Sequence, residues 1–125
     1  MSPLATVTVT EHGTVRVASI RGEVDLSNVD AVGADLFAMD GPGVTGIVID
    51  LSGTTYLDST GIRLLFNFTA QLHTRRQVVR IVAHTAIVRR VLVLTKLDDA
   101  VPFDATVDDA LAAIDAAERA DPPTP

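Results

Sequence analysis

Two short stretches of this 125-residue chain combine acidic and hydroxyl side chains in a way that could do chemistry. The first is Gly22-Glu23-Val24-Asp25, and the second is Asp58-Ser59-Thr60. The second stretch stands where a helical repeat of apolar residues begins, so it falls on the first turn of a predicted helix. Backbone N–H groups are unpaired on such a turn, and the helix dipole is positive there. The position suits either a capping carboxylate or a phosphate group.

These two possibilities give the triplet two interpretations. Asp and Ser are favoured N-caps in proteins of every kind, so Asp58 or Ser59 can simply satisfy the backbone of the helix. Alternatively, a phosphate added to a hydroxyl here would meet the positive end of the helix, which makes Ser59 or Thr60 a reasonable acceptor for phosphorylation. Spacing alone leaves both interpretations open.

An enzymatic interpretation finds less support in the sequence. Ser59 and His84 could join an aspartate in a hydrolase triad. The Gly-x-Ser-x-Gly elbow of such enzymes is missing, however, because the flanking positions hold Leu57 and Gly61. Glycine motifs that bind nucleotides are also absent from the sequence. We therefore predict that the chain is not an enzyme and needs no cofactor, and a small hydrolase remains the competing class.

Few side chains could hold a metal ion. The sequence has no cysteine, which excludes disulfides, thiolate zinc sites and iron–sulfur clusters. His12, His73 and His84 show no spacing that would place two ligands on one face of a helix. We expect solvent-exposed histidines and no metal site.

The composition is that of an ordinary globular protein. Hydrophobic residues make up 47% and charged residues 21% of the sequence, so the chain can bury a core. We expect a single domain over residues 1–120 and a disordered, proline-rich tail over residues 121–125. No secretory signal and no run of ~18 apolar residues occurs, so we expect a cytoplasmic protein without a membrane partner.

The charges are distributed in blocks. The net charge of −6 argues against a direct nucleic-acid partner. Residues 1–62 carry eight acids and two arginines, residues 63–96 carry seven basic residues and no acid, and residues 97–125 carry eight acids and one arginine. The blocks can pair with one another in the folded chain, or the basic block can form a face that meets an acidic partner. Both interpretations stay open.

The elements that must position the two motifs alternate between strand and helix patterns. Alternating residues over 6–10 and 15–20 predict a β-hairpin, with Gly13 supplying a positive φ in its turn. Apolar residues at helical spacing predict helices, and β-branched runs predict strands. The predicted helices cover residues 27–39, capped by Ser27, residues 59–73, a segment capped by Thr85, and a last segment opened by Thr106 and Asp109; the predicted strands cover residues 44–51, 78–82 and 101–103.

This alternation predicts an α/β fold with a mostly parallel sheet and right-handed crossovers. The first hairpin strand should run antiparallel at or near an edge, and the helices should lie mainly on one face. Function gathers at the carboxyl ends of parallel strands, where the connecting loops lie. We expect residues 21–25 and 50–61 to form two such loops.

The second predicted helix carries one further ambiguity. Leu64 and Phe68 are four residues apart and lie away from its main apolar stripe. They can form an exposed apolar pair that marks a partner site, or the helix can be buried broadly in a small core.

At this point the motifs resemble those of a known family. Gly22-Glu23-Val24-Asp25 resembles the GELD motif, and residues 57–62 resemble the D-S-[ST]-G-L phosphorylation motif, of the STAS-domain anti-sigma factor antagonists. The order of the predicted elements resembles that family over nearly the whole chain. The resemblance implies a STAS-like fold and a small bacterial regulator, which binds an anti-sigma factor serine kinase and so releases a sigma factor for transcription.

The resemblance also implies roles for individual residues. The kinase would phosphorylate Ser59, with Thr60 as the alternative, and a phosphatase would reverse the modification. Asp25 corresponds to an acid near that serine, and Asp58 to the acid of the motif itself. The implied partner-binding surface consists of Gly22, Glu23, Asp25, Asp58, Ser59, Thr60, Gly61, Ile62 and Arg63.

Two residues depart from the family pattern. Arg63 stands where a small residue is commoner, and His84 replaces a serine before Thr85. These departures bear on the choice of partner. The alternative within the same fold is a STAS subunit of another regulatory or lipid-transport assembly.

Overall fold

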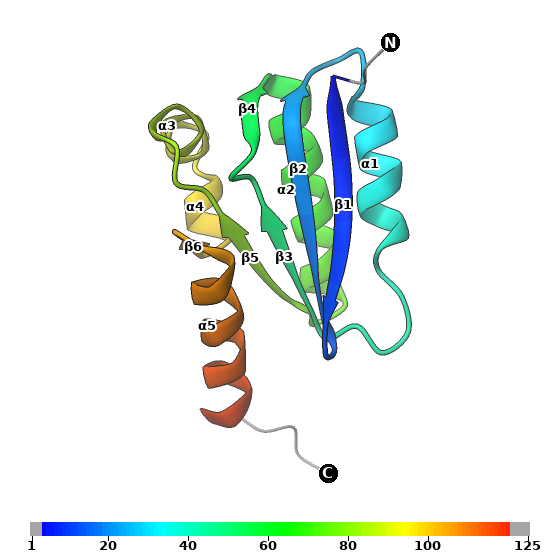
Figure 1. Ribbon diagram of the computed structural model, residues 1–125, viewed down its shortest axis with the longest axis vertical. Coiled ribbons are helices and arrows are strands. Elements are labelled where there is room, and N and C mark those ends of the chain that lie inside the picture. Colours follow the sequence, from blue (N-terminus) through cyan, green and yellow to red (C-terminus); the bar gives the residue numbers. More distant parts are fainter. Residues whose placement is uncertain (1–3, 121–125) are drawn as a thin grey trace.

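The computed structural model describes residues 4–120, in which strands and helices alternate along the chain (Figure 1). The strands are β1 (Ala5–His12), β2 (Val15–Val24), β3 (Gly46–Asp50), β4 (Thr54–Leu57), β5 (Val78–Val82) and β6 (Phe103–Asp104). The helices are α1 (Val29–Ala38), α2 (Ser59–Thr74), α3 (Ala86–Leu94), α4 (Leu97–Ala100) and α5 (Val107–Ala120). The tail predicted over residues 121–125 lies outside the described residues.

The strands form one mixed sheet in the order β1-β2-β3-β5-β6, and β4 also pairs with β2. β1 runs antiparallel to β2 at one edge, and all other pairs are parallel. Gly13 has the predicted positive φ of 64° in the turn between β1 and β2. The α/β architecture and the antiparallel N-terminal strand are confirmed.

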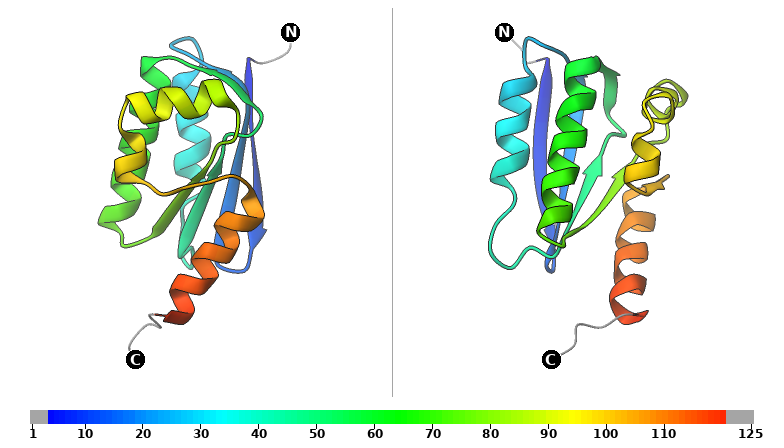
Figure 2. Two further views of the ribbon diagram at one scale, coloured as in Figure 1. Left: turned by 90° about the vertical axis from the view of Figure 1, so that its left-hand side faces the viewer. Right: turned by 180° about the vertical axis from the view of Figure 1, so that it is seen from behind.

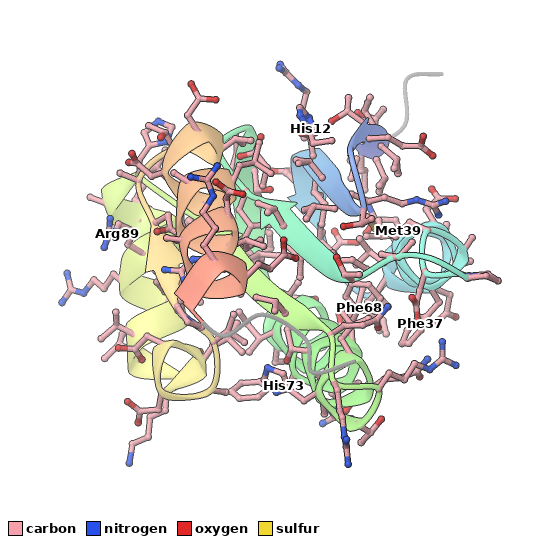
Figure 3. The ribbon with its side chains drawn as sticks, turned by 90° about the horizontal axis from the view of Figure 1, so that it is seen from below. His12, Phe37, Met39, Phe68, His73 and Arg89 are labelled. Atoms are coloured by element: carbon pink, nitrogen blue, oxygen red, sulfur yellow. The ribbon has the colours of Figure 1, made fainter. Side chains whose placement is uncertain are left out.

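Helices cover the two faces of the sheet unequally (Figures 2 and 3). α1, α2 and α3 pack against the larger core, which contains Ile47, Ile49 and Ile81 of the central strands. This arrangement confirms helices mainly on one face, because right-handed crossovers place the connecting helices there. α5 packs on the opposite face against a smaller core that includes Val48. It follows the last strand and connects no pair of strands, so the crossover rule does not govern it.

The ambiguity in α2 is settled in favour of burial. Phe68 is fully buried, and its ring packs edge-to-face on Phe37 of α1, with 5.0 Å between the ring centroids (Figure 3). Leu64 is half-buried and packs against the core, with its Cδ1 close to Gly33. Of the two alternatives left open for Leu64 and Phe68, broad burial is correct, because α1 lies over this side of the helix.

Both predicted loops turn out to contain strand. β2 continues to Val24, so Gly22 and Glu23 lie in the sheet rather than in a loop. The segment after β3 contains β4, whose residues pair in parallel with Gly22, Glu23 and Val24. The register shifts between Gly22 and Glu23. β4 was missed because its four residues are stabilised by this pairing with a distant segment of the chain.

The predicted helix caps have mixed outcomes. Asp109 donates its backbone N–H to the Thr106 hydroxyl at 3.1 Å, so the predicted cap of α5 is confirmed. Thr85 occupies the N-cap position of α3 but makes no capping hydrogen bond. Ser27 does not cap α1, which begins at Val29 after Asn28. The Ser27 hydroxyl donates instead to Asp25 at 2.5 Å, since the turn folds back on that carboxylate.

Candidate functional site

The ends of β2 and β4 bring the two motifs together. Val24 is paired with Leu57, and the backbone N–H of Asp58 donates to the Val24 carbonyl at 3.1 Å. Asp25 and Asp58 therefore follow directly on two neighbouring parallel strands. The two motifs therefore lie together at the carboxyl ends of neighbouring parallel strands, as predicted.

Asp58 caps α2 and also holds the neighbouring loop. Its Oδ1 atom accepts hydrogen bonds from the Thr60 N–H at 2.9 Å and the Gly61 N–H at 3.0 Å. The Thr60 hydroxyl donates to the same oxygen at 2.5 Å. Oδ2 accepts from the Leu26 N–H at 3.1 Å. One carboxylate thus fixes both the start of the helix and the loop after β2, and the capping interpretation is correct for Asp58.

These bonds favour the ionised carboxylate. The Thr60 hydroxyl, followed by the Gly61 amide, lowers the pKa of Asp58 below its ordinary value of 3.8. The folded protein therefore binds this proton more weakly than the unfolded chain does. The resulting stabilisation is present above the unfolded pKa and disappears as the pH falls through the folded pKa.

An Asp58→Asn variant tests this linkage. Asn is also a good N-cap, so the substitution removes the charge and keeps an oxygen in place. We expect the variant to be less stable than the parent chain at pH 7 and the difference to shrink as the pH falls below 3.8. Urea unfolding followed by circular dichroism at several pH values measures it. Asp35→Asn, at an exposed position of α1, is the control; a constant difference for Asp58→Asn would contradict the linkage.

The loop after β2 is rigidified by Asp25 and Asn28. Asp25 Oδ1 accepts from the backbone N–H of Ser27 at 2.9 Å as well as from its hydroxyl. Asn28 accepts the Asp25 N–H at 2.9 Å and donates to the Glu23 carbonyl at 2.8 Å. The loop is held by its own side chains, so Asp25 has a structural role in addition to its implied one.

Ser59 and Thr60 differ in what their hydroxyls do. Ser59 is exposed as the first residue of α2, and no residue of the described part of the chain forms a hydrogen bond with its hydroxyl. Thr60 is half-buried, and its hydroxyl is engaged by Asp58. Ser59 is the hydroxyl of this pair that an external enzyme can reach without breaking a bond. His84 is exposed and forms no hydrogen bond with Ser59, so the hydrolase triad does not assemble.

Two exposed apolar side chains beside the serine were missed in the sequence. Leu26 is 75% exposed and Tyr56 is 50% exposed, and both line a shallow groove with Asp25, Ser27 and Asp58. Leu26 directly follows the first motif and Tyr56 lies two residues before Asp58, but no local pattern distinguishes them from the buried neighbours Val24 and Leu57. Exposed apolar groups of this size beside polar ones are typical of a binding surface.

The remaining predicted residues divide between the surface and its support. Glu23 and Arg63 are exposed, whereas Gly61 and Ile62 are buried. A Cβ atom at Gly61 would lie 3.1 Å from Leu57 and 3.2 Å from Val24, so glycine allows the helix to start close to the sheet. Because Gly61 and Ile62 are buried, they could influence binding only by positioning the exposed residues around them. Gly22 is half-buried.

A second groove opens between α1 and α2, next to the serine. Its volume is about 480 Å³, and Thr60 and Arg63 form one wall together with Leu64. Phe37 and Asp30 contribute from α1. The two grooves flank the start of α2 and extend the surface around Ser59 on both sides.

The basic block pairs in part with the acidic ones. Arg75 contacts Asp40 at 2.5 Å, and Arg80 contacts Asp104 at 2.6 Å. Within residues 4–120, Arg63 makes no ion pair and remains available beside the site. The three histidines are exposed as predicted. No cluster of His, Asp and Glu in the described ranges could hold a metal ion.

Comparisons with known proteins agree with this geometry. Residues 6–110 match the model of the STAS domain family. The anti-sigma-F factor antagonist RsfB of Mycobacterium tuberculosis is 33% identical over 109 residues, which cover 87% of this chain and 88% of RsfB. No helix within residues 4–120 has the length and hydropathy needed to cross a bilayer.

Solved structures give the same picture. An anti-sigma factor antagonist from Mycobacterium paratuberculosis superimposes with a TM-score of 0.81 at 33% identity, covering 87% of this chain and 92% of that one. A putative anti-sigma factor antagonist from Thermotoga maritima has a TM-score of 0.79 at 21% identity, covering 86% and 92%, which supports the fold. Motifs, topology and relatives together establish that this chain belongs to the STAS domain family.

Proposed function

We propose that the chain is an anti-sigma factor antagonist, a binding protein that sequesters an anti-sigma factor and so frees a sigma factor for transcription. The binding surface is centred on Ser59 and includes the loop after β2. The similar proteins from Mycobacterium are anti-sigma factor antagonists, which supports this class of activity. They are binding proteins, so no catalytic activity is proposed for this chain.

The mechanism is a switch at Ser59. A serine kinase, the anti-sigma partner itself, transfers phosphate to this hydroxyl, and a phosphatase removes it. The observation that carries this proposal is the exposed, uncommitted Ser59 hydroxyl on the first turn of α2. A phosphate there adds about −1.5 to −2 charges next to Asp58. The unmodified surface binds and the modified one is repelled, with no rearrangement of the fold.

The site of modification is tested by phosphopeptide mapping after incubation with ATP and the partner kinase. The kinase is first recovered by affinity capture from the source cytoplasm and identified by mass spectrometry. Phosphate should be incorporated into the parent chain and into Thr60→Ala, and it should be lost in Ser59→Ala. Modification of Thr60 alone would contradict the proposal. Because Thr60→Ala leaves the Asp58 contacts to both backbone amides intact, it is a matched control.

Arg63 should contribute to the rate of partner association. It is exposed beside Ser59 and lacks an ion pair among the described residues, so it can attract an acidic surface. We expect Arg63→Ala to slow association several-fold at low salt and to have little effect at high salt, where charges are screened within about 10 Å or less. Surface plasmon resonance at two salt concentrations measures this. Arg75→Ala is the control, since Arg75 is already paired with Asp40; equal effects for both variants would refute the prediction.

A STAS subunit of another assembly would share this scaffold. The capture experiment distinguishes an anti-sigma factor antagonist from such a subunit, because an antagonist should recover an ATP-binding serine kinase. Recovery of other STAS proteins or of transporter subunits would favour the alternative.

A further inference from the structure

We infer that the outer edge of β1 is a self-association surface, through which two copies of this chain join their sheets in a two-fold antiparallel pair. β1 lies at the free edge of the sheet, with β2 on its other side (Figure 3). No strand pairs with its outer edge among residues 4–120. An open edge of eight residues presents a row of unpaired backbone groups.

The register of the hairpin shows which backbone groups face outward. The Glu23 N–H donates to the Leu4 carbonyl at 2.9 Å, so these opposed residues form a hydrogen-bonded pair. Such pairs alternate along an antiparallel ladder. The backbone groups of Thr6, Thr8 and Thr10 therefore point to β2, and those of the intervening residues point outward; these are Ala5, Val7, Val9 and Glu11.

Apart from Glu11 near its end, the edge lacks the features that keep natural edge strands apart. The sequence of β1 is Ala-Thr-Val-Thr-Val-Thr-Glu-His, with no proline, lysine or glycine. Valine and threonine are strong strand formers, and register shifts or bulges do not interrupt its pairing with β2. Val9 remains 42% exposed, although Ala5 and Val7 on the same face pack against the core. The strand is uninterrupted, is apolar on one side from Ala5 to Val9, and is open to addition of another strand.

The symmetric sequence of the strand favours a second copy of this chain as the partner. Residues 6–10 read Thr-Val-Thr-Val-Thr in both directions, so a two-fold axis at Thr8 places threonine opposite threonine and valine opposite valine. Val7 then faces Val9 of the second copy, and their outward backbone groups form the new ladder. Glu11 lies opposite Ala5. A centre at Val9 would overlap the same number of β1 residues, but it would leave Ala5 unpaired and place Glu11 opposite Val7.

This association would leave the Ser59 surface free. Gly22 is paired with Ala5, so the start of β1 lies near the end of the sheet that carries the site. A two-fold axis at Thr8 reverses the second copy along the strand. The two Ser59 surfaces then point to opposite ends of one continuous sheet, and each can engage its own partner.

Single-cysteine variants test the register, because the chain has no cysteine of its own. At the proposed axis the Cα atoms of position 8 in the two copies are about 4.5 Å apart, within the range for a disulfide. Position 10 lies opposite position 6, so its two copies are about 13 Å apart. Under mild oxidation, Thr8→Cys should form a covalent dimer at least about tenfold faster than Thr10→Cys. Equal rates would overturn the proposed pairing.

Sedimentation velocity of the unmodified chain and of Val9→Pro completes the test. The parent should show a concentration-dependent shift to twice the monomer mass. Val9→Pro removes an outward N–H and leaves the ladder to β2 intact, so it should sediment as a monomer with an unchanged circular dichroism spectrum. A parent chain that stays monomeric at every concentration would overturn the inference. If Val9→Pro fails to fold, the comparison of the two cysteine variants decides.

Discussion

Ser59→Asp should bind the anti-sigma partner at least about a hundredfold more weakly than the parent chain, whereas Ser59→Ala should bind as tightly as the parent and escape control by the kinase. The added carboxylate lies beside Asp58, whose oxygens are already committed to the helix and the loop. An uncompensated charge desolvated in an interface costs on the order of several kcal/mol, and each 1.4 kcal/mol is about tenfold in affinity.

Isothermal titration calorimetry of the two variants decides whether this charge acts at the interface or on the fold. Both should keep the parent's circular dichroism and melting temperature, because Ser59 is exposed and Asp58 supplies the helix cap. Equal affinities for Ser59→Asp and Ser59→Ala would remove Ser59 from the interface. An unfolded Ser59→Asp would instead assign the serine a structural role.

Gly22→Ala should destabilise the chain by at least about 2 kcal/mol, since two separate costs coincide at this position. Gly22 has a φ of 101°, which side chains other than glycine's rarely adopt. A Cβ atom there would also lie 2.1 Å from the Leu4 carbonyl oxygen, and that backbone cannot retreat without breaking its bond to Glu23. The end of β2, and with it the Asp25 loop, would have to move.

The matched control is Gly41→Ala. Nothing lies within 4 Å of a Cβ atom at Gly41, and its φ is not positive. This variant should have an unchanged free energy of unfolding or gain up to about 1 kcal/mol, because alanine restricts the unfolded chain. Urea denaturation of both variants measures the difference. If the free energy of unfolding falls no more in Gly22→Ala than in Gly41→Ala, the end of β2 accommodates the added methyl group and the prediction is wrong.

Local patterns predicted most of the fold, and they failed where distant segments decide the structure. The span of α2 and the limits of β5 follow from periodicity within single segments. β4 does not, because Thr54–Leu57 becomes a strand only through its pairing with β2. Phe68 was ambiguous for the same reason. Its burial depends on Phe37, which lies 31 positions earlier in the chain.

The candidate site shows the same division. The motif around Ser59 and the capping role of Asp58 could be predicted from spacing and resemblance. The role of Ser27 was not predicted, because its hydroxyl donates to the Asp25 carboxylate instead of capping α1, while Asn28 accepts the backbone N–H of Asp25. The exposure of Leu26 and Tyr56 could not be predicted either, because it depends on how the whole chain packs around its core. The bond from Leu26 to Asp58 joins residues 32 positions apart, which no local pattern reports.

The position of α5 on the rear face has an evolutionary consequence. Its side chains pack against a core separate from the one beneath α1 and α2, and no residue of that rear core lines the grooves beside Ser59; its buried members are Val15, Val17, Val48, Val82, Ala110 and Ile114. The sheet therefore separates the face that carries Ser59 from substitutions in the rear core. Under the proposed function, we expect selection on partner choice to act on the face that carries Ser59 and selection on stability alone to act on the rear face. We therefore expect α5 to be the part of the described domain that can diverge between relatives without altering the proposed switch.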